Sequence, residues 1–232
     1  MYLLTETASP FALERWAAFF ANFGQFAKGF FYTLGISIGA LIVALLLGLI
    51  FGAMSSTHNK VLRGISRVYV EIFQNTPLLV QFVVVFYGIS ILTDGHVMIP
   101  ISLTAILCVG VYTGAYISEI IRTGIEAVPK GQTEAALSQG FTYADTMRII
   151  ILPQAVRTIL PPLTNQVVNL MKNTSTVAII SGADIMFTAK AWAYDTTNYV
   201  PAFAGAAFLY FIMCFPLATW ARRKEEENKK AY

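Results

Sequence analysis

Uncharged polar side chains recur inside the apolar part of this chain, and ligand binding is the chemistry that they support. Gln166, Asn169 and Asn173 lie three and four residues apart, with Asn165 beside them, so they form one stripe on a helix. An amide donates and accepts hydrogen bonds, and it costs free energy in an apolar setting unless it finds a partner. The stripe therefore predicts either hydrogen bonds between helices or contacts with a polar ligand.

Two more polar side chains belong to the same prediction. Gln81 follows Pro77, which lacks a backbone donor and is expected to kink a helix or to start one. Thr113 stands beside Tyr112 in another apolar run. We expect the following residues to line a polar pathway: Gln81, Thr113, Asn165, Gln166 and Asn169. The centres of these runs hold neither an acid nor a base, so the side chain of a ligand desolvated there should be polar and neutral.

One ion pair is expected beside this pathway. Glu119 and Arg122 are three residues apart, so they can pair on one face of a helix. We interpret the pair as structural in the first place and as part of a gate only in the second.

Histidine and cysteine are too few and too far apart for catalysis or metal binding. His58 and His96 lie on either side of one long apolar run, which would hold them apart, with no ligand-spaced carboxylates near them. Cys108 and Cys214 lie in apolar runs, where small packing residues are common. The sequence contains no GxxxxGK[ST] loop, so it lacks the usual phosphate-binding segment of an ATPase.

Composition indicates the element type that must position these residues. The chain has 232 residues, of which 56% are hydrophobic and 12% charged, about half the charge of an ordinary soluble domain. We predict an all-α integral membrane protein with five transmembrane helices. The runs long enough to cross a hydrocarbon layer of about 30 Å are 30–54, 68–92, 101–121, 155–171 and 201–220.

The apolar runs divide the chain into three parts. Residues 1–29 are rich in aromatic side chains and are expected to lie along the membrane interface, without the pattern of a removable signal peptide. Residues 30–221 form the transmembrane domain, and residues 222–232 form a charged tail. Most of the 16 lysines and arginines fall between the first and second runs, between the third and fourth, and in the tail. By the positive-inside rule, the amino terminus is outside and the carboxyl terminus cytoplasmic.

A polar segment, residues 129–153, interrupts the apolar runs and is expected in the cytoplasm. Good helix formers follow Pro129, and Gly140 is suited to a left-handed helix stop. Thr142 and Asp145 form a weak capping box for a second helix that runs toward Pro153. The spacing is Glu134-Ala-Ala, three residues, Gly140, nine residues, Ile150, one residue, and then Leu-Pro.

This spacing resembles the EAA loop of bacterial ATP-binding-cassette importer permeases at every defined position. The segments FQNTPLLVQF, GAYISEIIRTGIEAVPKGQTEAALSQG and LMKNTSTVAII resemble those of the polar amino-acid permeases of the histidine, glutamine and glutamate type. The likeness extends over roughly residues 30–220. Gln74 and Asn173 depart from it, since many relatives carry Arg and Asp there.

The resemblance implies a permease subunit, not an enzyme, with a helix pair between the third and fourth spans that couples it to an ATPase. The coupling residues would be Glu134, Ala135, Ala136 and Gly140. The implied partners are two ATPase subunits that bind ATP and Mg, a second permease subunit, identical or related, and an extracytoplasmic binding protein. The cargo would be a polar amino acid, glutamine first, crossing a bacterial cell membrane into the cytoplasm. Relatives that carry basic amino acids tend to have an acid near Gln166, so an amide there fits a neutral cargo.

Two other classes fit the sequence less well. A secondary amino-acid transporter driven by an ion gradient commonly needs an intramembrane carboxylate and paired repeats of spans, and five spans cannot divide equally. A membrane-embedded enzyme would need a metal site or a nucleophile. Nucleic acid is not expected as a partner, because the basic residues are scattered near the ends of the apolar runs.

Overall fold

The protein is a bundle of long helices with short helices at its ends. The structure is a computed structural model that describes residues 9–230, except the side chains of residues 224, 225 and 227–230. Every regular element within this range is helical, as the apolar runs predicted. Lys224, Lys229 and Lys230, which entered the topology prediction, have side chains outside the described part.

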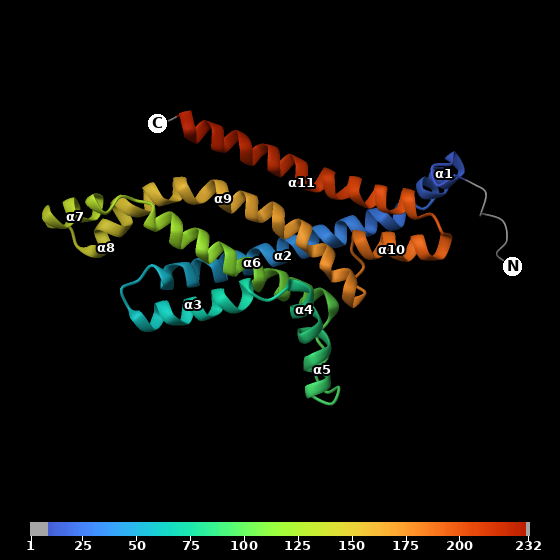
Figure 1. Cartoon of the computed structure of the whole chain (residues 1–232), viewed down its shortest axis with the longest axis horizontal. Helices are drawn as coiled ribbons and strands as arrows, with labels where there is room; N and C mark the ends of the chain where they lie inside the picture. Colours follow the sequence, from blue (N-terminus) through green and yellow to red (C-terminus); the bar gives the residue numbers. More distant parts are fainter. Residues whose placement is uncertain (1–8, 231–232) are drawn as a thin grey trace.

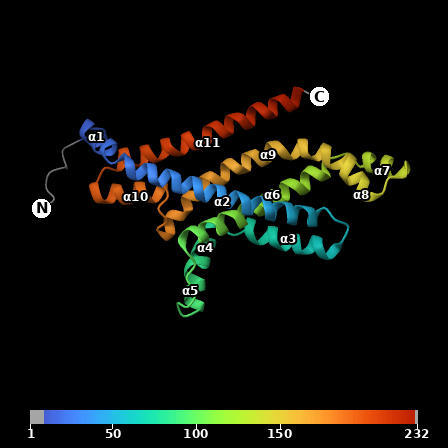
Figure 2. The ribbon, with the colours of Figure 1, turned by 180° about the vertical axis from the view of Figure 1, so that it is seen from behind.

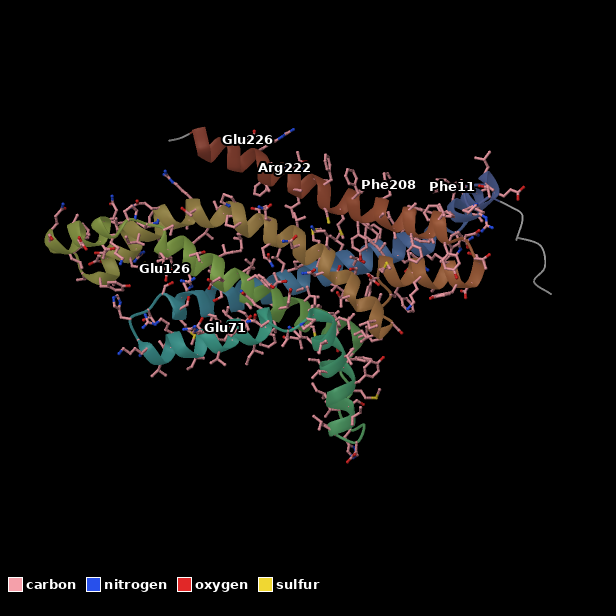
Figure 3. The ribbon with its side chains drawn as sticks, viewed as in Figure 1. Phe11, Glu71, Glu126, Phe208, Arg222 and Glu226 are labelled. Atoms are coloured by element: carbon pink, nitrogen blue, oxygen red, sulfur yellow. The ribbon has the colours of Figure 1, made fainter. Side chains whose placement is uncertain are left out.

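Four long helices make up the body of the bundle. They are α2 (Phe23–Ser55), α6 (Ile101–Glu126), α9 (Leu152–Asn173) and α11 (Tyr199–Lys230). Helix α2 packs along α6, α6 against α9, and α9 against α11, as the front and rear views agree (Figures 1 and 2). The side chain of Phe208 on α11 is 62% exposed and projects from the outer side of the bundle (Figure 3).

Short helices close the two ends of the bundle. Helix α10 (Ile185–Thr196) lies beside the start of α11, and α7 (Lys130–Ser138) lies at the opposite end (Figure 1). Other short helices are α1 (Leu13–Ala21), α8 (Tyr143–Asp145), η2 (Thr146–Ile151) and η3 (Thr174–Ile180).

The expected span 68–92 is a sharply bent pair of helices. Helix α3 (Lys60–Gln74) ends at Asn75, and α4 (Leu78–Val83), η1 (Val84–Gly88) and α5 (Ile89–Leu92) continue at an angle of 97°. This second limb projects from the bundle as an arm (Figure 1).

Pro77 causes the bend and Gln81 stabilises it. Because Pro77 has no N–H donor, the helix ladder cannot continue through it, which confirms the predicted kink. The Gln81 amide donates to the carbonyl oxygens of Phe73 at 3.2 Å and Thr76 at 3.1 Å, and so occupies acceptors that the bend leaves free.

Three helices among the described residues are long and apolar enough to cross a membrane, or four if the bent pair counts as one span. The three are Phe23–Ser55, Ile101–Glu126 and Tyr199–Arg223. The expected fourth span, 155–171, lies in α9, which does not meet the same test. The five predicted crossings are therefore not confirmed, because α9 is polar along one side and the second span is bent.

The predicted interfacial segment 1–29 is partly built into the bundle. Its residues 1–8 lie outside the described part, and from Phe23 onward it belongs to α2. Phe19 and Phe26 are buried and meet the ring of Trp192 edge to face, with centroids 6.0 and 5.7 Å away. Two of the aromatic side chains of this segment thus pack against α10.

Helices α2 and α6 approach closely because small residues face each other. Ala40, Ala44, Gly48 and Gly52 form a buried stripe with a period of four on α2. A Cβ atom on Gly48 would lie 2.4 Å from Cγ2 of Ile117, so no larger side chain fits without a shift of α6. Small residues of this kind allow van der Waals packing between helices where lipid removes the hydrophobic driving force.

We predict that Gly48→Ala destabilises the bundle by about 1–3 kcal/mol through overpacking. Gly35→Ala on the same helix is the matched control, because a Cβ atom there meets nothing within 4 Å. Thermal unfolding in detergent should show a lower midpoint for Gly48→Ala only. Equal midpoints for the two variants would contradict the close approach of α2 and α6.

Candidate functional site

A polar cavity of about 410 Å³ lies between α6 and α9. Helix α6 contributes Tyr112 and Tyr116, whose hydroxyl oxygens are 3.1 Å apart. Helix α9 contributes Gln166, Asn169, Lys172 and Asn173. The structure therefore brings three members of the predicted amide stripe to one cavity wall.

The amides of this wall are available to a ligand. In the described part of the chain, the side-chain amides of Gln166 and Asn169 make no hydrogen bond to another side chain or to the backbone. Of the two roles open from the sequence, bonds between helices of the same chain are therefore not made. The side chains can instead donate to and accept from a polar molecule in the cavity.

The other predicted pathway residues lie elsewhere. Gln81 holds the bend after α3, as described above. Thr113 is fully buried, and its hydroxyl has no hydrogen-bond partner in the described part of the chain. Asn165 is exposed and does not line the cavity. These three side chains thus do not lie on the cavity wall that Gln166 and Asn169 form.

The cavity contains a cation that sequence reasoning did not assign to it. Lys172 lies in the last turn of α9, where a positive charge also complements the helix dipole. Among the described residues it forms no ion pair with a carboxylate. The signal was its spacing of three from Asn169, which continues the polar stripe by one turn.

A larger cavity of about 810 Å³ lies nearer the end of the bundle that carries α7. Charged side chains of α3 and α6 line it, and Glu71 and Glu126 mark these two helices in Figure 3. The Arg122 guanidinium donates to Glu119, with Nε 2.9 Å from Oε2, and also bonds Glu126. The predicted ion pair is thus confirmed, with a second carboxylate added.

Both cavities lie along one face of α6. Tyr112, Tyr116, Glu119 and Glu126 follow at spacings of four, three and seven, which keep them on one side of a helix. The first two line the smaller cavity and the last two line the larger one. A polar track along α6 therefore joins the middle of the bundle to the α7 end.

The predicted coupling segment folds as a helix with a glycine stop. Pro129 stands at the N-cap position of α7 without a side-chain hydrogen bond, and Gly140 adopts φ +87°, the left-handed conformation that the sequence predicted. The N–H of Gly140 donates to Leu137 O at 3.0 Å, and that of Phe141 donates to Ala136 O at 3.1 Å. This pair of bonds is the Schellman arrangement, which satisfies the last carbonyls of a helix.

The coupling residues differ in exposure. Glu134, Ala135 and Gly140 are exposed, so a partner can reach them. Ala136 is only 3% exposed, because α7 turns this side toward η2. Of the four predicted coupling residues, Glu134, Ala135 and Gly140 are therefore open to a partner, whereas Ala136 packs inward beneath them.

The second half of the segment begins as predicted and ends differently. The Thr142 hydroxyl accepts from the Asp145 N–H at 3.2 Å and caps α8. Helix α8 then continues through the π-helical turn η2 into α9, so Pro153 does not end it. A proline lacks a donor and crowds the preceding turn, and the wider turn of η2 accommodates both effects.

Buried side chains join the coupling segment to the walls of the cavities. Val128, Ile151, Ala155 and Ile159 form one hydrophobic cluster that also contacts Ile125 of α6. Because interiors of this kind are closely packed, displacement of α7 and η2 should carry α6 and α9 with it.

One buried carboxylate was missed by the sequence reasoning. Asp184 is 1% exposed and accepts N–H bonds from Met186 at 3.2 Å and Phe187 at 2.9 Å, as well as the Tyr210 hydroxyl at 3.1 Å. It caps α10 and lines neither cavity. An Asp directly before an apolar helix is the usual signature of such a cap. No group of three or more His, Cys, Asp or Glu residues within the described range could hold a metal ion.

Long apolar helices that pack through close small-residue contacts, with a polar cavity between two of the helices, define a helical membrane protein. The family model of the binding-protein-dependent transport system inner membrane component matches residues 44–225. The chain belongs to this family, which confirms the resemblance given by the EAA spacing.

Two relatives cover most of the chain. It is 37% identical to the probable glutamine ABC transporter permease protein GlnM of Bacillus subtilis (strain 168), over 92% of this chain and 97% of that protein. It is 33% identical to the glutamate/aspartate import permease protein GltJ of Escherichia coli (strain K12), over 82% of this chain and 85% of that protein.

Solved structures show the same fold. A crystal structure of an amino acid ABC transporter with histidines has a TM-score of 0.84 at 31% identity, over 91% of this chain and 97% of that chain. An inward-facing form of the MetNI methionine ABC transporter shares the fold, with a TM-score of 0.68 at 17% identity, over 88% of this chain and 98% of that chain.

We predict that Gly140→Leu impairs coupling and leaves the bundle assembled. A left-handed φ costs a residue with a Cβ atom about 1–2 kcal/mol, although the space around Gly140 is open. Gly140→Asn is the matched control, because asparagine tolerates this conformation. Copurification of the ATPase subunit that the resemblance implies should fall for Gly140→Leu and persist for Gly140→Asn. If the ATPase subunit copurified normally with Gly140→Leu, the result would contradict a role of the Gly140 turn in coupling.

Proposed function

We propose that this chain is the transmembrane permease subunit of an ATP-driven importer that carries a polar amino acid into the cytoplasm, with glutamine as the first candidate. The observation that carries the proposal is the cavity wall of unpaired amides, Gln166 and Asn169, in a chain with an EAA coupling segment. A carboxamide and a zwitterionic head group both need donors and acceptors, which amides supply. The relative named as a probable glutamine permease supports this cargo.

Partner chains supply the energy and the cargo. The assembly would contain two ATPase subunits that bind ATP and Mg, and one of them would dock on Glu134, Ala135 and Gly140 of this chain, with Ala136 behind these residues. A second permease subunit, identical or related, and an extracytoplasmic binding protein complete the assembly. ATP shifts the pathway from inward-open to outward-open only in so far as it binds one arrangement better than the other.

The proposed orientation in a bacterial cell membrane has the amino terminus outside, the carboxyl terminus in the cytoplasm and five crossings. The turn between α2 and α3, the coupling segment and the carboxyl terminus all lie at one end of the bundle, while α1 and α10 lie at the other (Figure 1). This arrangement supports the division that the basic residues predict. Helix α9 would be the fourth crossing, with its polar side turned away from lipid.

Substrate would pass from the smaller cavity to the larger one along the polar face of α6. Gln166 and Asn169 would contact it first, and Tyr116 and Glu119 mark the route toward the α7 end. The pathway roles of Gln81, Thr113 and Asn165 stay predictions.

An acidic amino acid is the second candidate cargo. Lys172 lines the smaller cavity, and a desolvated carboxylate needs a cation near it. The similarity to a glutamate/aspartate permease points in the same direction.

The alternative of an ion-driven transporter would need a carboxylate free to exchange its ion, whereas Asp184 accepts hydrogen bonds from three donors.

Uptake by the assembled importer tests the cargo. Labelled glutamine should enter proteoliposomes only with ATP inside the compartment that holds the ATPase, and unlabelled glutamine should compete better than glutamate or arginine. Gln166→Leu should raise the KM for transport about fivefold, since one hydrogen bond is worth about 1 kcal/mol. Thr158→Val, on the same helix and outside the cavity, is the control.

The competition pattern separates the candidates. Stronger competition by glutamate, lost in Lys172→Gln, would favour the acidic cargo. Strong preference for arginine would refute the charge argument, and unchanged uptake in Gln166→Leu would remove this residue from the pathway.

A further inference from the structure

The short turn between α2 and α3 lies at the lip of the larger cavity. His58 is exposed and lines this cavity together with Ser55 and Lys60. The helices on both sides of the turn are firmly ended. The Ser55 hydroxyl donates to Gly52 O at 2.7 Å, and Asn59 Oδ1 accepts from the N–H of Val61 at 2.9 Å. A side chain in this turn is therefore held between two capped helices.

His58 touches the coupling segment. Its ring meets the ring of Tyr143 edge to face, with centroids 5.0 Å apart and planes at 82°. Tyr143 is the first residue of α8, three positions after the left-handed turn at Gly140. The contact joins residues 85 positions apart in the chain. It therefore links α8 directly to the turn between α2 and α3, without passing through α6.

Hydrogen bonds join helix α3 to α2 and α6 along its length. A displacement of the turn before α3 would therefore move α3 together with the side chains that it contributes to the larger cavity. The Ser66 hydroxyl donates to Phe51 O at 2.7 Å, and the Tyr69 hydroxyl donates to Val111 O at 2.7 Å. Near its far end, Gln74 donates to Ala115 O at 3.2 Å. One side of the larger cavity is thus a braced wall whose first residues follow His58.

We propose that His58 and Tyr143 form a positioning contact that carries movement of the coupling segment to the α3 wall of the larger cavity. The inference rests on the proposed function, since it assigns a second attachment for the same coupling segment. The first attachment is the buried cluster on α6 and α9. With both contacts in place, nucleotide-driven movement of α7 and α8 displaces the α3 and α6 walls of the larger cavity together. Without the His58–Tyr143 contact, only the α6 wall follows this movement directly.

The test is the number of amino acid molecules transported per ATP hydrolysed by the assembled importer in proteoliposomes. His58→Ala should lower this ratio roughly two- to tenfold, the range that the energy of one aromatic pair supports. His58→Phe keeps an aromatic ring that can meet Tyr143 edge to face, and it should retain the wild-type ratio. Because His58 lies outside the coupling segment, ATPase binding should be normal in both variants.

A second substitution checks that the partner ring is Tyr143. The double variant His58→Ala, Tyr143→Ala should transport as many amino acid molecules per ATP as the worse of the two single variants, because each single substitution already removes the same contact. Tyr194→Ala is the control, since it removes an aromatic pair with Tyr199 at the other end of the bundle. Its ratio should equal that of the wild type.

Two results would overturn the inference. One is a wild-type ratio in His58→Ala, and the other is an additive loss in the double variant. Either result leaves the proposed function intact as long as the wild-type assembly transports with ATP. Failure of the wild-type assembly to transport any amino acid would instead contradict the proposed function itself.

Discussion

Close packing of α2 against α6 is the constraint on which the rest of the structure depends. Gly110 and Gly114 of α6 turn toward α2, where added Cβ atoms would meet Val43 and Leu47 at 2.7 and 3.0 Å. This contact fixes the rotation of α6 about its axis. The residues on the opposite side, Tyr112 among them, then face α9 and the smaller cavity. One small-residue interface thus decides which side of α6 is polar and accessible.

Local signals in the sequence predicted the coupling segment well. The left-handed stop at Gly140, the cap at Thr142 and the break at Pro77 each depend on one residue and its immediate neighbours. Such features follow from φ preferences and missing or added hydrogen bonds, so no knowledge of the fold is needed. The shared face of Gln166 and Asn169 followed in the same way from helical spacing.

Features that depend on tertiary contacts were not accessible from the sequence. Ala136 packs inward because η2 lies under α7, and Lys172 reaches the smaller cavity because α6 lies opposite it. Gln81 is used at a bend whose angle no local pattern gives. The five predicted crossings are not confirmed for a related reason: α9 is too polar to be recognised as a span by its apolar length, and its place in the bundle comes from its neighbours.

In the proposed importer, the buried cluster of side chains around Ile151 and Ile159 would join the surface where an ATPase docks to the polar cavity, so nucleotide should change which side of the membrane reaches that cavity. The most direct measurement is labelling of Asn169→Cys by a membrane-impermeant maleimide in the assembled importer, with Cys108 and Cys214 replaced by serine. We predict that a non-hydrolysable ATP analogue slows labelling from the cytoplasmic side and speeds labelling from the outside. Equal labelling rates with and without nucleotide, from both sides, would contradict it.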